Sequence, residues 1–225
     1  YEEAAVLYRS NAQSRAIEEA LLRVSIPYRI YGGLRFYERL EIKNAISYLR
    51  IIFNNNDNPS FERSISNPTR GVGEKTLAKI RNAAKQYNIS YIKASAKLID
   101  EGKISGRGGS GLKDYLEFIA GCKGFIEENS LSDLMELIIK ETGLYAYHAK
   151  EAGEKGKTRT ENLEELITAT KNFEQSIKDE RTNIEIAESY LDIISLDSGE
   201  RQASEHDDAC LLYTSDAADE VAGVV

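Results

Sequence analysis

The stretch Asn67–Ile80 reads NPTRGVGEKTLAKI, and it decides how the surrounding chain is interpreted. Gly71 and Gly73 flank a single apolar residue, Val72, and a helical pattern of apolar residues follows at once. Glycine permits positive φ angles and lets another backbone approach closely. The stretch therefore predicts a helix-hairpin-helix, in which Val72 packs into the core and a second helix runs from Glu74 to Tyr87.

The residues of this turn suit a phosphate group. The backbone amides from Gly73 to Lys75 would lie at a helix N-terminus, where unpaired N–H groups and the helix dipole favour an anion. Thr76 adds a hydroxyl, and Arg70, Lys75 and Lys79 add positive charge. Contacts of this kind recognise a nucleic-acid backbone rather than its base sequence. The alternative is an ordinary capped turn whose lysines face solvent.

The chain around this basic turn is acidic. It has 225 residues, a formal net charge of -8, and 41% hydrophobic and 29% charged residues, which is typical of a globular protein. No apolar run approaches the roughly 20 residues that span a bilayer, and the first residues lack a signal-peptide pattern. We expect a cytoplasmic protein without a membrane partner. Cys122 and Cys210 fit no disulfide framework, and no metal-ligand spacing or catalytic constellation is visible.

The pattern of apolar residues divides the chain into two unlike parts. Residues 4–8 and 28–31 are predicted strands, and residues 12–24 between them are a predicted helix, which makes a βαβ-like unit. After the break at Gly32-Gly33 the pattern becomes helical. Helices are expected at residues 37–53, 61–66, 74–87, 90–101, 111–129, 131–142, 160–173 and 183–196. The expected fold is mainly α, a helical domain joined to part of an α/β domain.

Two glycine-containing stretches resemble nucleotide-binding motifs without their context. Residues 153–158, GEKGKT, end like a P-loop, but they lack its first glycine and follow no predicted strand. We predict a basic surface loop there, which offers a second phosphate contact through Lys155, Lys157 and Arg159. Residues 106–111, GRGGSG, match G-x-G-x-x-G, also without a preceding strand, so we predict a flexible linker between helices.

Four motifs in the same order resemble the UvrD/PcrA/Rep family of bacterial DNA helicases. They are YRSNAQSR with EEAL at residues 8–21, PYRIYGG with the residues up to 43, PTRGVG at 68–73, and EKGKTR with ENLEEL at 154–166. The first of these is a motor-domain motif, carried here by Tyr8, Arg9, Ser10, Asn11, Gln13 and Arg15.

The resemblance implies a 3′-to-5′ helicase that uses ATP and Mg²⁺ to open duplex DNA in repair and replication. It implies that residues 1–33 belong to the second RecA-like motor domain, an incomplete P-loop NTPase fold. Residues 34–200 would form the helical 2B-like insertion subdomain. Residues 201–225 would be a return segment that departs from the family at Cys210 and ends in a tail that is not native.

The resemblance also assigns the turn to the backbone of duplex DNA that carries a single-stranded tail. The DNA-binding residues that it implies are Thr69, Arg70, Gly71, Val72, Gly73, Lys75 and Thr76. The basic stretch at residues 153–159 adds Lys157 and Arg159 as expected DNA contacts. The family's ATP-hydrolysis motifs are not found in this sequence, so we expect no catalytic residue and no ATPase activity from this chain alone. The alternative is a non-enzymatic helical module, whose acidic faces at Glu127-Glu128 and Glu164-Glu165 bind repair or transcription proteins.

Overall fold

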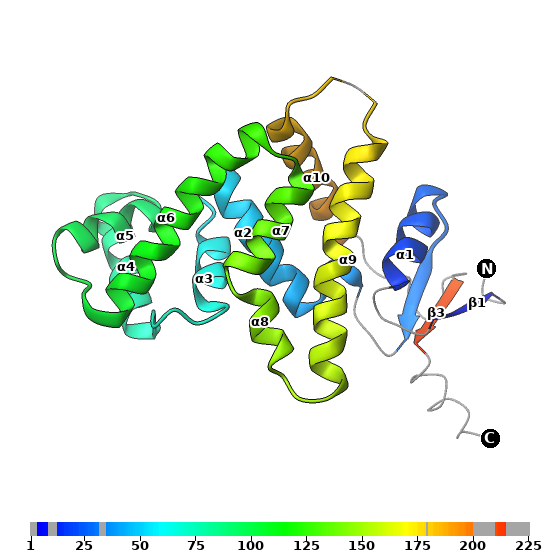
Figure 1. Ribbon diagram of the computed structural model, residues 1–225, viewed down its shortest axis with the longest axis horizontal. Coiled ribbons are helices and arrows are strands. Elements are labelled where there is room, and N and C mark those ends of the chain that lie inside the picture. The colour runs from blue at the N-terminus through cyan, green and yellow to red at the C-terminus, as the bar shows by residue number, and fades with distance from the viewer. Residues whose placement is uncertain (1–3, 9–12, 32–34, 179, 200–209, 215–225) are drawn as a thin grey trace.

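A computed structural model describes residues 4–8, 13–31, 35–178, 180–199 and 210–214. Most of these residues are helical, which confirms the expectation of a mainly α chain. A small sheet with one helix lies at one end of the molecule, and a larger group of helices extends away from it to the other end (Figure 1). Gly32-Gly33, the predicted break between the two parts, lies outside the described residues.

The sheet consists of three parallel strands in the order β1-β3-β2. The two predicted strands are present as β1 (Ala5–Tyr8) and β2 (Tyr28–Tyr31), connected by α1 (Ser14–Arg23). The central strand β3 (Cys210–Thr214) pairs with both of its neighbours, and Leu212 lies opposite a residue of each. No strand was predicted in this segment. The sequence of this strand, CLLYT, shows no polar–apolar alternation, so its pattern did not predict a strand.

The larger part is built from one 3₁₀ turn and the helices that follow it. These are η2 (Phe36–Glu38), α2 (Leu40–Phe53), α3 (Asn58–Ser66), α4 (Glu74–Tyr87), α5 (Tyr91–Asp100), α6 (Gly106–Glu128), α7 (Leu131–Glu141), α8 (Leu144–Ala149), α9 (Glu154–Ser176) and α10 (Asn183–Gly199). Helix α2 lies at the centre and packs against α3, α6, α7 and α9. Because it is covered on nearly every side, ten of its residues are buried.

Two expectations about the connections were wrong. The stretch expected to be a flexible linker forms the first turns of α6, which begins at Gly106 rather than at residue 111. The stretch expected to be a basic surface loop forms the start of α9, which begins at Glu154 rather than at residue 160. The short helix α8 was not among the expected helices. At the starts of α6 and α9, tertiary packing stabilises a helix where local composition favours a loop.

Candidate nucleic-acid interface

The predicted helix-hairpin-helix is present as α3, a turn and α4. Gly71 has a φ of 75°, which is the left-handed conformation that the turn requires. Val72 is only 8% exposed and belongs to the main hydrophobic core, as predicted. Gly73 has a φ of -94° and is the N-cap residue of α4, so only the first glycine of the pair is needed for its backbone angle.

The start of α4 offers backbone N–H groups to solvent. The first amide hydrogen bonds of this helix run from Thr76 and Leu77 to the carbonyl oxygen of Gly73, at 2.9 and 3.0 Å. In the described part of the chain, the amides of Gly73, Glu74 and Lys75 find no acceptor, and these three residues are exposed. Such a helix N-terminus has the geometry and partial positive charge to bind an anion.

The glycine-rich start of α6 packs directly against this turn. A Cβ atom on Gly108 would lie 2.9 Å from the carbonyl oxygen of Gly71, and one on Gly111 would lie 2.1 Å from that of Arg70. The glycines therefore let the two backbones approach closely. A Cβ atom on Gly71 would in turn lie 3.0 Å from Cγ of the exposed Arg107.

Arg107 thus joins the candidate site, although it was not among the residues predicted from the sequence. Its position brings a second helix N-terminus, that of α6, beside that of α4. The sequence feature that could have indicated this placement of α6 is the spacing of its glycines, which reflects close backbone packing rather than a flexible linker.

Arg70 supports the turn from within. Its guanidinium donates hydrogen bonds to the carbonyl oxygens of Pro68 (2.9 Å) and Thr142 (3.1 Å), and it lies over the rings of Tyr48 and Tyr115 at 5.4 and 5.7 Å. The Tyr48 hydroxyl donates to the carbonyl of Asn67 at 2.9 Å. Burial raises the pKa of both tyrosines, which keeps them neutral. These contacts fix the turn against α6 and the end of α7.

The other residues of the turn differ in their exposure and in the charges that lie near them. Thr69 and Lys75 are exposed and Thr76 is half-buried. Glu74, the acid nearest to the free amides, is paired with Arg81, which also binds Glu62. The negative charge of Glu74 is thereby partly offset, and the exposed ammonium of Lys75 is left beside the open amides.

The two predicted DNA contacts on α9 lie in a separate region. Arg159 donates to both carboxylate oxygens of Glu151 at 2.6 and 2.8 Å, and its Nε lies 3.7 Å from a carboxylate oxygen of Glu41. Lys157 is exposed, with the Glu161 carboxylate 4.0 Å away. The hydrogen bond from buried His148 is the main cause of the lowered pKa of Glu151, and Arg159 adds to it.

Arg15, one residue of the predicted motor-domain motif, lies at the joint between the two parts of the fold. Tyr8, the last residue of β1, is buried, and Gln13 is exposed. Arg15 is 4% exposed and pairs with Glu19 on its own helix and with Glu165 on α9, each at 2.6 Å. Arg9, Ser10 and Asn11 lie outside the described residues.

A second buried arginine, Arg39, crosses the same joint. It donates to the hydroxyl oxygen of Ser14 on α1 at 2.6 Å and to the amide oxygen of Asn162 on α9 at 2.9 Å. Asn162 in turn donates to Glu41 at 2.6 Å. Nearby, burial raises the pKa of Glu18, whose carboxylate accepts a bond from the amide of Phe36. The α/β unit is therefore bound to the helical domain through buried polar contacts.

The fold thus defines a helical domain that carries a basic helix-hairpin-helix and is joined to part of a parallel α/β domain. Residues 1–104 match the family described as UvrD-like helicase C-terminal domain. Together with the relatives below, this match shows that the chain belongs to the UvrD-like helicase family.

Two relatives illustrate the likeness. DNA helicase II of Escherichia coli (strain K12) is 44% identical over 212 residues, which cover 94% of this chain and 29% of the relative. The ATP-dependent DNA helicase PcrA of Bacillus subtilis (strain 168) is 35% identical over 216 residues, covering 95% of this chain and 29% of the relative. The chain therefore spans less than a third of the length of these relatives. Among the described helices, none is long and apolar enough to cross a membrane.

Proposed function

We propose that this chain is the part of an ATP-dependent DNA helicase that contacts the duplex ahead of the single-stranded tail. The observation that carries this proposal is the set of open backbone amides at Gly73, Glu74 and Lys75, with the start of α6 packed beside them. Phosphates of the DNA backbone are the anions that this site would bind. Recognition through amides and exposed cations is independent of base sequence.

The proposed site residues divide by role. Lys75, Thr76 and Thr69 would contact phosphate oxygens, together with the backbone of Gly73 and the newly included Arg107. Gly71, Val72 and Arg70 would position the turn, since Val72 packs into the core and Arg70 bonds to carbonyl oxygens within the chain. Lys157 would provide a separate contact on α9, and Arg159 would orient the start of that helix through Glu151.

We assign the two parts of the fold as the family resemblance implies. Residues 1–33 would belong to the second RecA-like motor domain, and residues 34–200 would form the 2B-like insertion subdomain. Residues 201–225 would return the chain to the motor domain. The parallel pairing of β3 with β1 and β2 supports this assignment, because parallel strands connected through a helix are the building units of motor domains. The intact helicase would unwind duplex DNA in the 3′-to-5′ direction, in repair or replication.

ATP and Mg²⁺ would serve the intact helicase rather than the residues described here. The stretch that ends like a P-loop, residues 153–158, forms the N-cap and the first residues of α9, comes after α8 and does not follow a strand. A triphosphate cradle needs a strand, a glycine loop and a helix in that order. We therefore derive no ATP-dependent step from these residues, and we expect the purified chain to hydrolyse no ATP. DNA-stimulated phosphate release by this chain would overturn that expectation.

The test of the DNA site is fluorescence anisotropy with a labelled duplex that carries a single-stranded tail. Lys75→Ala should weaken binding for every duplex sequence alike and lower the slope of log affinity against log salt by about 1. Thr76→Ala should weaken binding without changing that slope. Lys113→Ala removes another exposed cation, on α6 outside the turn, and should leave binding nearly unchanged. Equal effects of Lys75→Ala and Lys113→Ala would contradict the assignment.

A further inference from the structure

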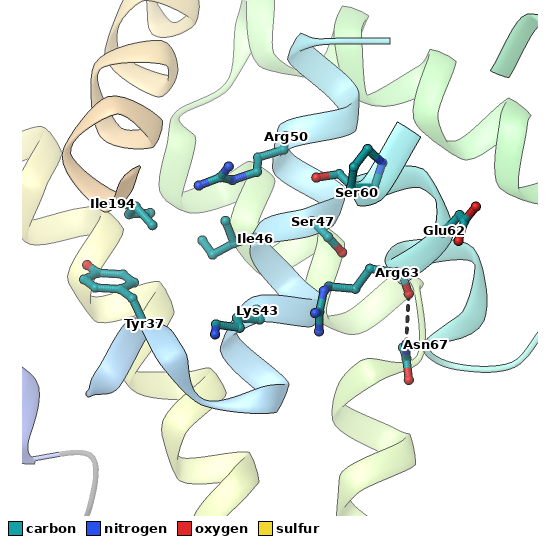
Figure 2. A pocket seen from close by; sticks show the side chains of 11 residues that line it. Tyr37, Lys43, Ile46, Ser47, Arg50, Ser60, Glu62, Arg63, Asn67 and Ile194 are labelled. Carbon is teal, nitrogen blue, oxygen red and sulfur yellow. Dashed lines mark hydrogen bonds between the residues drawn. The ribbon is translucent and has the colours of Figure 1, made fainter. Parts of the chain in front are cut away.

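A groove of about 620 Å³ lies between α2, α3 and the end of α10, outside the proposed DNA site. Its size is within the range of ligand-binding clefts. The side chains of Lys43, Ile46 and Arg50 project from one face of α2, and Arg63 reaches toward them from α3 (Figure 2). The groove is lined by Tyr37, Lys43, Ile46, Ser47, Arg50, Pro59, Ser60, Glu62, Arg63, Asn67 and Ile194.

Three cations of this groove lack acidic partners. Over the described residues, no carboxylate lies within 4.0 Å of the charged nitrogens of Lys43, Arg50 or Arg63. Arg50 donates to the hydroxyl of Ser195 at 3.0 Å, and Arg63 makes a long contact of 3.4 Å to the amide oxygen of Asn44. Both partners are neutral, so the positive charge of the groove is not compensated.

The acid on the rim of the groove does not change this balance. Glu62 is the acidic residue among the described lining residues, and its two carboxylate oxygens accept bonds from Arg81 at 2.6 and 2.7 Å. The chain as a whole has a net charge of -8, whereas this groove is positively charged because its three cations are not compensated. Charge complementarity therefore calls for an anionic occupant.

The walls of the groove indicate which kind of anion fits. The apolar part of the lining consists of the side chains of Ile46, Pro59 and Ile194 and the ring of Tyr37. A phosphodiester backbone gains nothing from apolar walls, so the apolar part of the lining argues against nucleic acid as the occupant. A peptide that mixes carboxylates with apolar side chains can use both features, because arginine forks bind carboxylates and the apolar walls bury the intervening residues.

We infer that the α2–α3 groove binds an acidic peptide segment of a partner protein, with Lys43, Arg50 and Arg63 pairing to its carboxylates. The groove reaches the proposed DNA-binding turn at Asn67, and its lining residue Glu62 is linked through Arg81 to Glu74. Neither Lys75 nor Thr76 lines the groove, so substitutions of these residues test the two sites separately.

The test measures anisotropy of a fluorescein-labelled peptide in which Asp and Glu alternate with Leu and Phe, titrated with the full 225-residue chain. A matched peptide with Asn and Gln in place of Asp and Glu controls for apolar binding. The double variant Lys43→Glu/Arg63→Glu should weaken binding of the acidic peptide about tenfold or more. Both side chains are exposed, so the fold should be kept, which circular dichroism and the urea midpoint will verify.

The control variant Lys113→Glu/Lys123→Glu changes the net charge equally, on exposed residues of α6 outside the groove, and should leave binding unchanged. The inference is supported if only the groove variant loses the acidic peptide and Lys75→Ala keeps it. It is overturned if the acidic peptide fails to bind at millimolar concentration, if the neutral peptide binds equally well, or if the two charge variants behave alike. Loss of duplex DNA binding, rather than peptide binding, in the groove variant would assign the surface to nucleic acid and also overturn it.

Discussion

Replacing Gly111 by alanine should destabilise the chain, although the same change normally stabilises a helix. In a helix interior, alanine is favoured over glycine by about 1 kcal/mol. Gly111 lies in the second turn of α6, where an added Cβ atom would sit 2.1 Å from the carbonyl oxygen of Arg70. Contacts below 3.0 Å are essentially not found for Cβ atoms, so the two backbones must separate by about 0.9 Å, the difference of the two distances.

The free-energy cost of Gly111→Ala depends on the contacts that resist this separation of the two backbones. The neighbouring atom belongs to the backbone of the turn, and the Arg70 side chain anchors the turn to the carbonyl oxygens of Pro68 and Thr142. Overpacking of a tight contact costs about 1–3 kcal/mol. We expect the upper part of that range, which leaves a net loss of about 2 kcal/mol after the helix preference is subtracted.

The assay is urea unfolding followed by far-UV circular dichroism, with the free energy of unfolding taken from the midpoint and slope. Gly121→Ala and Gly124→Ala are the matched controls, since they lie on the same helix with no atom within 4 Å of the added Cβ. These variants should gain up to about 1 kcal/mol. If Gly111→Ala proved as stable as the controls, the close contact between α6 and the turn would be refuted.

Three further predictions concern other parts of the fold. Burial raises the pKa of Glu18, so the folded state holds this proton more tightly than the unfolded state, and the stability from this group falls as pH rises above the usual glutamate pKa. Urea unfolding at several pH values should therefore show Glu18→Gln gaining stability relative to the wild type as pH rises. A difference between the two proteins that does not change with pH would contradict this. Burial also raises the pKa of the Cys122 thiol to about 12, so iodoacetamide should label it at pH 8 only after unfolding, as mass spectrometry can show. Ser130→Ala should cost about 1 kcal/mol in urea unfolding, because Ser130 and Asp133 form the capping box of α7, whereas an unchanged midpoint would argue against that cap.

Helix α4 shows how much of the fold local sequence can predict. Its bounds, Glu74–Tyr87, were predicted correctly because a glycine precedes it and apolar residues recur on one face. Asn88 ends it in the left-handed conformation that asparagine tolerates, with a φ of 51°. Both signals are local, so they are visible without the tertiary structure.

The start of α6 could not be predicted in the same way. Four of its first six residues are glycine, which locally favours a flexible linker. The helix forms because Gly108 and Gly111 admit the backbone of the turn, a contact between residues distant in sequence. The central strand β3 was missed for a related reason, since its pairing with β1 and β2 is not encoded in its own pattern.

The candidate site was likewise only partly predictable. The burial of Val72 followed from an apolar residue between glycines, and the structure confirmed it. The internal contacts of Arg70 and Arg159 could not be foreseen, because an arginine that binds carbonyl oxygens or a half-buried acid has the same sequence signature as one that faces solvent. Arg107 became visible only when α6 was placed beside the turn.

The most direct test of the DNA site is to follow backbone amide resonances of the labelled chain by NMR during titration with a tailed DNA duplex. If phosphates bind at the open start of α4, the amides of Gly73, Glu74 and Lys75 should shift most, accompanied by that of Arg107, and the shifts should shrink as salt is raised. Shifts confined to other surfaces, with these four amides unmoved at saturating DNA, would contradict the proposal that this turn is the duplex-binding site.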